Sequence, residues 1–228
     1  MPVATKAKAS KNGTQAPTAK AAKSEQRVTI KSPKLETIEV PIVGTSPYVQ
    51  HAFGQKAKQE ILAKQTAGGK GRGRKNTTAR DLDADYKSAF HVGLDDHYGI
   101  PCSALRSAMI SACRLVGVTM TKAKLSVFIL PDTFDRNTGE PLFHLFGDPE
   151  RYEAPVRLES GVITIAIRPM WKEWRAVPKI RYDGDQFDAS DVCNLLLRAG
   201  MQVGIGEGRH DSRKSNGIGF GTFEIEED

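Results

Sequence analysis

The chain has 228 residues, enough for one domain of ordinary size or two small ones. Its 33 lysines and arginines outnumber its 27 aspartates and glutamates, and the formal charge of +6 suits a polyanionic partner. No run approaches the roughly 18 apolar residues of a membrane helix and no secretion signal is recognisable, so we expect a cytoplasmic protein with no membrane partner.

Residues 1–36 are predicted to form a disordered basic tail. The segment is mostly Ala, Lys, Thr and Ser with almost no large apolar residue, so it cannot bury enough surface to offset its ordering entropy. It either keeps the protein soluble or attracts phosphates and acidic partners. Residues 37–228 are expected to form a single α+β domain.

The first half of this domain is predicted to begin with a strand at 38–43 and a helix within 55–65. Residues 66–81 place cations among glycines without an apolar anchor, which predicts a flexible, exposed basic loop. A hairpin with its turn at Asp95 and Asp96 is expected next. A helix then begins near Cys102, with Ser103 as its N-cap and one apolar face formed by Leu105, Met109 and Ala112 or Cys113.

The second half is predicted to contain strands at 124–130, 161–170 and 174–184. A helix follows that begins at Asp188 or Ser190 and ends at Gly200, and a last strand covers 219–225. This order of elements is typical of an antiparallel sheet with helices on one face. We therefore expect an α+β, ferredoxin-like (RRM-like) fold.

Signals for catalysis and metal binding are weak. The five histidines show neither HExxH nor HxH spacing with a carboxylate, so no metal site and no cofactor are expected. The glycine-rich stretch 204–225 lacks the spacing of both phosphate-loop motifs and follows a helix, which disfavours a nucleotide site. His210, beside Arg209 and Asp211, is the one weak catalytic candidate, as the base of a metal-independent ribonuclease.

Three segments favour binding to single-stranded nucleic acid: the basic loop, the stretch "RPMWKEWRAVPKIRY" and the glycine-rich stretch. Glycines let the backbone approach phosphates, and cations alternating with Trp and Tyr suit a surface on which bases stack. Alternatively, the tryptophans belong to the core and the cations form a solvated face. The candidate binding residues are Lys70, Arg72, Arg74, Lys75, Arg80, Arg168, Trp171, Lys172, Trp174, Arg175, Lys179, Arg181, Gly206, Gly208, Arg209, Arg213 and Lys214.

Two segments of the chain carry a resemblance to a known family. The segment "YGIPCSALRSAMISA" and the closing strand "GIGFGTFEI" resemble the RAMP superfamily, whose members form the RNA-gripping backbone of CRISPR effector complexes. This resemblance implies a RAMP-like fold, with Ser103 and Arg106 near the bound strand. The folded region also resembles a group of small proteins of tailed bacteriophages, which implies a role in phage replication or recombination.

The leading hypothesis is a non-catalytic protein that coats single-stranded nucleic acid, with DNA favoured over RNA, as a homo-oligomer or filament. If the chain is phage-encoded, it would act in the cytoplasm of the bacterial host. The alternatives are a RAMP-type CRISPR RNA-binding subunit, a metal-independent ribonuclease, and a structural or assembly protein. Phosphate and stacking contacts serve both nucleic acids, so the residues alone do not separate DNA from RNA.

Overall fold

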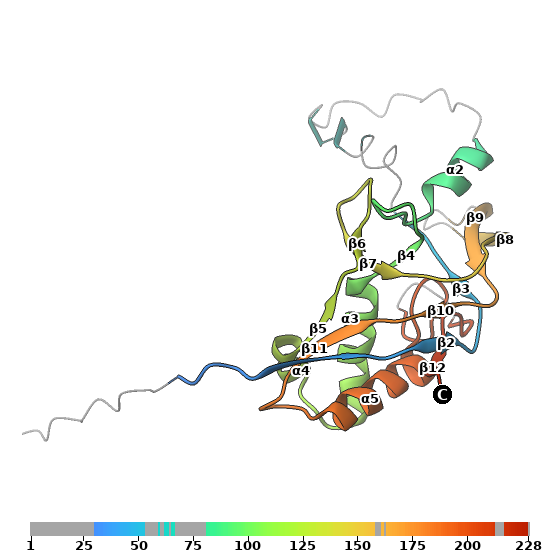
Figure 1. The fold of residues 1–228 in the computed structure, drawn as a ribbon. Helices are drawn as coiled ribbons and strands as arrows, with labels where there is room; N and C mark the ends of the chain where they lie inside the picture. The colour runs from blue at the N-terminus through green and yellow to red at the C-terminus, as the bar shows by residue number, and fades with distance from the viewer. Residues whose placement is uncertain are drawn as a thin grey trace, which may run out of the picture. The chain divides into compact units, whose positions relative to one another are not determined.

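The computed structural model describes residues 30–52, 59, 62–63, 65–66, 81–157, 161, 163–212 and 217–227 (Figure 1). From Pro33 onward, the described residues belong to one compact unit. Most of the predicted tail and of the predicted basic loop lies outside the described residues. Among the described helices, none combines the length and apolar character needed to cross a membrane.

The described residues form an α+β fold. The helices are α2 (Leu82–Ser88), α3 (Cys102–Ala112), α4 (Met120–Ser126) and α5 (Ala189–Arg198), with a 3₁₀ turn at Cys113–Leu115 and a π-helical turn at Ala199–Val203. The strands are β1 (Leu35–Glu39), β2 (Ile42–Gly44), β3 (Tyr48–Val49), β4 (Gly99–Pro101), β5 (Val127–Leu130), β6 (Thr133–Phe134), β7 (Pro141–His144), β8 (Glu150–Arg157), β9 (Ile163–Trp171), β10 (Arg175–Ala176), β11 (Lys179–Asp183) and β12 (Phe223–Ile225).

Every strand pairing in the described part of the chain is antiparallel. The strands divide among four three-stranded sheets with the orders β1-β11-β5, β10-β2-β12, β3-β9-β8 and β4-β7-β6. The α+β class and the antiparallel pairing agree with the sequence prediction, whereas the division into four sheets differs from the one sheet expected. Most of the strands have five residues or fewer, and proline and glycine interrupt the chain between them.

Helix α3 lies at the centre of the fold and packs against α4, α5, β5 and β7 (Figure 1). Its predicted apolar face is confirmed, because Leu105, Met109 and Ala112 have no exposed surface. The predicted cap at Ser103 is wrong. Pro101 occupies the N-cap position without a side-chain cap, and the Ser103 hydroxyl instead donates to Glu140 Oε1 at 2.6 Å.

Helix α5 begins at Asp188, one of the two predicted starts. Asp188 Oδ1 accepts a hydrogen bond from the Asp191 backbone N–H at 2.7 Å, and the two residues form a capping box. The helical turns continue past the predicted end at Gly200, through the π-helical turn, to Gly204. Gly200 allows close packing of β12, because a Cβ there would lie 2.7 Å from the Phe223 ring.

The predicted hairpin around Asp95 and Asp96 is reduced to a tight turn. Residues 82–88 form α2, and a β-bridge between Val92 and Tyr98 crosses the turn together with the hydrogen bond from the Gly93 N–H to the His97 carbonyl. Asp96 takes a positive φ of 68° at its tip. This conformation is open to aspartate at modest cost, and it reverses the chain before β4.

Trp171 and Trp174 belong to the core, so the predicted stacking surface on these two rings is corrected. Their exposed fractions are 0% and 2%, and Tyr48 packs between them with ring centroids 5.8 and 5.6 Å away. Trp174 Nε1 donates to the Ser46 carbonyl at 2.8 Å. A base cannot reach a ring face that is covered on both sides by protein, and the apolar area that both rings bury stabilises the fold instead.

Candidate nucleic-acid interface

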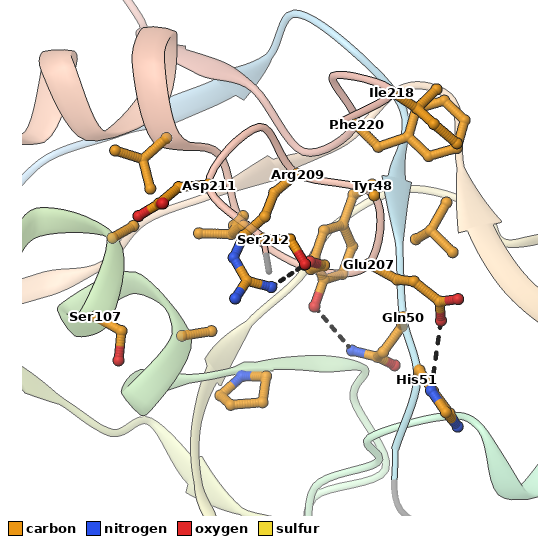
Figure 2. Close-up of a pocket in the computed structure, with 18 of the residues that line it drawn as sticks. Tyr48, Gln50, His51, Ser107, Glu207, Arg209, Asp211, Ser212, Ile218 and Phe220 are labelled. Atoms are coloured by element: carbon orange, nitrogen blue, oxygen red, sulfur yellow. Dashed lines mark hydrogen bonds and ion pairs between the residues drawn. The ribbon is translucent and has the colours of Figure 1, made fainter. Parts of the chain in front are cut away.

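A groove of about 850 Å³ lies beside α3. We call it the α3 groove. One wall is α3, a second is the chain after β3, a third is β8, and the glycine-rich loop closes it (Figure 2). Its lining includes Tyr48, Gln50, His51, His91, Ser103, Ser107, Ser111, Tyr152, Glu207, Arg209, Asp211, Ile218 and Phe220.

The α3 wall is built from small side chains. Ser103, Ser107 and Ser111 recur every four residues and face the groove, on the side of the helix away from the buried Leu105 and Met109. Small side chains keep this wall open to a polymer that approaches the helix. The Ser103 hydroxyl donates to Glu140 and Ser111 Oγ accepts from Arg114 Nη2 at 3.3 Å, so Ser103 keeps acceptor capacity and Ser111 keeps its donor.

The opposite wall depends on glycines in left-handed backbone conformations. Gly204, Gly206, Gly208, Gly217, Gly219 and Gly221 all have positive φ. At Gly206 a Cβ would lie 2.6 Å from both the Tyr48 ring and the Val49 carbonyl oxygen. The neighbouring Glu207 N–H donates to that same oxygen at 2.9 Å. The glycines therefore attach the loop closely to β3, in addition to any approach they allow to a ligand.

A small charged cluster lies at the mouth of the groove. Arg168 Nε donates to Glu207 Oε2 at 2.8 Å. His51 Nδ1 lies 3.4 Å from the same oxygen, a contact that Figure 2 shows. The pKa of His51 is lowered, first by burial and then by the positive charge of Arg168, while Glu207 opposes both. Glu207 therefore holds the guanidinium of Arg168 and the imidazole of His51 close together.

A hydrogen-bonded network of buried polar groups supports the floor. His91 Nδ1 lies 2.9 Å from Asp135 Oδ2, and the His91 backbone N–H donates to Gln50 Oε1 at 2.8 Å. Gln50 Nε2 donates to the Tyr48 hydroxyl at 3.3 Å (Figure 2). Burial would raise the pKa of Asp135, but donors from Thr138, His91 and Asn137 outweigh it and leave that pKa lowered. The imidazole of His91 is thus held in one orientation.

Aromatic surface is present at the rim, on residues that the sequence reasoning did not select. Tyr152 and Phe220 are half-buried and meet edge to face, with ring centroids 5.9 Å apart and an angle of 81° between the rings. Ile218 lies beside Phe220 and is 60% exposed (Figure 2). These side chains offer the partly open ring surface that Trp171 and Trp174 lack.

Of the residues predicted from the sequence, Ser103, Gly206, Gly208 and Arg209 line the groove. Arg209 Nη1 donates to the Gly206 carbonyl at 3.0 Å. Arg168 does not line the groove itself but forms an ion pair with Glu207, which does. These five residues come from three separate segments of the chain and meet at one site.

Other predicted residues face away from the groove. Arg106 Nε donates to the Val127 carbonyl at 2.9 Å, and its guanidinium lies over the Phe128 ring, which Arg181 also contacts. Lys172 pairs with Glu150, Arg175 with Glu226 and Lys179 with Asp132, at 2.7, 2.5 and 3.0 Å. His210 is exposed and does not contribute to the described groove lining.

Seven predicted residues lie outside the described residues, and their role in binding stays a prediction. They are Lys70, Arg72, Arg74, Lys75, Arg80, Arg213 and Lys214.

The groove also contains residues that the sequence analysis missed. The serine spacing of α3 was a readable signal, because three small polar residues alternate with an apolar face at helical period. His51, His91 and Tyr152 carry no such local signal. They come from separate segments: the antiparallel pairing of β3 and β8 with β9 brings His51 near Tyr152, and the hydrogen bond from the His91 N–H to Gln50 attaches the segment of His91.

No protein-family model and no curated protein matches this chain. Among solved structures, the chain is similar to one chain of the "Cryo-EM structure of the Type III-B Cmr-beta bound to cognate target RNA", with a TM-score of 0.43 and 12% sequence identity. The similarity covers 85% of this chain and 60% of that chain, so this chain spans less than two thirds of the other's length. A partial likeness of this kind concerns the path of the chain and not what its side chains bind.

Proposed function

We propose that this protein binds single-stranded nucleic acid in the α3 groove without cleaving it, and that RNA is the preferred ligand. One observation carries the proposal: a small-residue helix face, a glycine-shaped loop and a pair of half-buried aromatic rings converge on one open groove. Single-strand binding combines backbone contacts with stacking of bases on aromatic side chains, and this groove offers both.

The preference for RNA rests on the hydroxyl-lined wall. A protein distinguishes RNA from DNA by hydrogen bonds to the 2′-hydroxyl group, which both donates and accepts. Ser107 and Ser111 present hydroxyl donors along one helix face, and Ser103, which donates to Glu140, can still accept. In this proposal Arg209 and His51 contact phosphate oxygens, and the bases stack on Tyr152 and Phe220.

The proposal differs from the leading hypothesis of the sequence analysis, which favoured DNA. We propose that the protein acts as a RAMP-type, ferredoxin-like RNA-binding subunit. The similar Type III-B Cmr-beta structure is bound to cognate target RNA, but the support comes from the groove. We also propose that several copies of the protein bind side by side along one strand. Coating of single-stranded DNA in phage replication is the competing outcome of the test.

Fluorescence anisotropy with labelled 20-nucleotide RNA, DNA of the same sequence, and duplex tests this proposal. We expect RNA to bind most tightly and the affinity to fall with increasing salt, because phosphate contacts release counterions. Tighter binding to DNA would favour the coating hypothesis. Affinity that does not change with salt would remove phosphate contacts as the driving force and would overturn the proposal.

Ser107→Trp locates the binding site. The new ring fills the α3 groove from an exposed helix position, so we expect at least a 10-fold loss of RNA affinity with an unchanged circular dichroism spectrum. The matched control is Ser190→Trp, on an exposed α5 serine outside the described groove lining. Equal affinities for both variants would place the RNA elsewhere.

A metal-independent ribonuclease is a second candidate function. Its base would be His91 and not His210, because His91 lines the groove and is oriented by Asp135. In such a reaction an imidazole takes the 2′-hydroxyl proton, the 2′-oxygen attacks phosphorus, and the 5′-oxygen leaves with a proton. Shortened products from labelled RNA in EDTA that disappear in His91→Gln, but persist in His210→Gln, would establish this reaction. Intact RNA after prolonged incubation supports the non-catalytic function.

A further inference from the structure

Three side chains gather away from the α3 groove, between the turn before β4 and the end of β7. Asp95, His97 and His144 each bring one ligand atom within 4.8 Å of the others. Asp95 Oδ2 lies 2.7 Å from His144 Nε2 and 3.8 Å from His97 Nδ1. The centroids of the two imidazole rings are 5.0 Å apart, and the rings are tilted by 40° to each other.

The backbone holds Asp95 and His97 in place. The Gly93 N–H donates to the His97 carbonyl at 2.8 Å, and the His97 N–H donates to Asp95 Oδ1 at 3.3 Å. Arg136 donates to the Gly93 carbonyl at 3.0 Å and pairs with Asp96. Since Asp96 is engaged by Arg136, Asp95 is the carboxylate of this turn that faces the histidines.

A further carboxylate supports His144 from behind. Asp132 Oδ2 accepts the His144 backbone N–H at 3.0 Å and lies 3.8 Å from the second ring nitrogen, Nδ1. Asp132 is largely buried, and Lys179 lies 3.0 Å from its other oxygen. Asp132 therefore fixes the position of His144 through the backbone N–H, which holds the imidazole near Asp95.

We propose that Asp95, His97 and His144 bind a divalent transition-metal ion of the zinc class. Two imidazoles and one carboxylate form a ligand set that suits Zn²⁺ and Co²⁺. Their ligand atoms lie close enough for small side-chain rotations to bring them to one ion, and Asp95 and His97 are exposed, so water can complete the coordination. The ion would join the turn at 92–98 to β7, independently of the nucleic-acid groove.

Metal titration of the full-length protein, produced without a histidine tag and stripped with a chelator, tests this site. Zn²⁺ is titrated against a chromophoric chelator, and Co²⁺ binding is followed by its visible absorption. We expect about one equivalent of either ion to bind tightly, with Co²⁺ absorption typical of a low coordination number. His97→Ala should weaken binding at least 10-fold. His210→Ala, which changes an exposed histidine elsewhere, should bind as the wild type does.

His97 is exposed, so its substitution should leave the fold intact, which circular dichroism checks. Asp95→Asn provides a second variant with the same expected loss and a nearly unchanged shape. Equal Zn²⁺ affinities for the wild type, His97→Ala and Asp95→Asn would overturn the proposal and leave the cluster as an ion pair between His144 and Asp95. A loss in both variants would confirm it.

Discussion

Gly206→Ala should destabilise the protein more than Gly217→Ala. Both glycines have positive φ, 80° and 63°, which costs an alanine roughly 1–2 kcal/mol. The surroundings differ. A Cβ at Gly206 would lie 2.6 Å from the Tyr48 ring and the Val49 carbonyl, whereas at Gly217 the nearest atom is 3.5 Å away. Overpacking of this kind adds about 1–3 kcal/mol, so the two losses should differ by about 2 kcal/mol.

Thermal unfolding measures this difference. For a protein of this size, about 2 kcal/mol corresponds to a melting temperature about 4–8 °C lower for Gly206→Ala than for Gly217→Ala. Because the displaced loop forms a wall of the α3 groove, RNA affinity should also fall in Gly206→Ala at temperatures where the variant stays folded. Equal melting temperatures for the two variants would refute the close contact between the loop and β3.

Three further predictions concern single side chains. The pKa of His51 is held below its usual value of about 6.5 by burial and Arg168, so the unfolded chain takes up the proton first as the pH falls, and the folded state loses stability. Between pH 7 and 5.5, His51→Gln should therefore lose less unfolding free energy in urea titrations than the wild type. An identical loss in both proteins would contradict this. Burial raises the pKa of Cys102 to about 12, so in the folded protein a thiol reagent at pH 8 should modify Cys193 well before Cys102, as peptide mass spectrometry can show. Asp188→Ala removes the α5 capping box and should cost about 1 kcal/mol in chemical denaturation, which an unchanged midpoint would exclude.

Local patterns predicted the main helices well. The apolar spacing of 102–112 identified the buried face of α3, and Asp188 marked the start of α5, because both signals lie within a few consecutive residues. The Ser103 cap failed because Pro101 already occupies the N-cap position. An N-cap preference is a weak local signal, and Ser103 has a stronger partner in Glu140, distant in the sequence.

The candidate site was predictable only in part. The glycine-rich loop and Ser103 were identified, since glycine spacing and the helix start are visible in the sequence. Trp171 and Trp174 were misjudged as a surface because aromatic residues between cations suit a core strand equally well. Only their packing against Tyr48 decides between the two.

The sequence by itself determined the α+β class, the buried face of α3, the start of α5 and the position of the glycine-rich loop. These features follow from periodicity, capping and φ preferences that act over short distances along the chain. Only the tertiary structure decided the division into four sheets, the meeting of α3 with Tyr152 and Phe220, and the approach of His144 to Asp95 and His97. Such contacts depend on strand pairings between distant segments, and no short stretch of sequence encodes them.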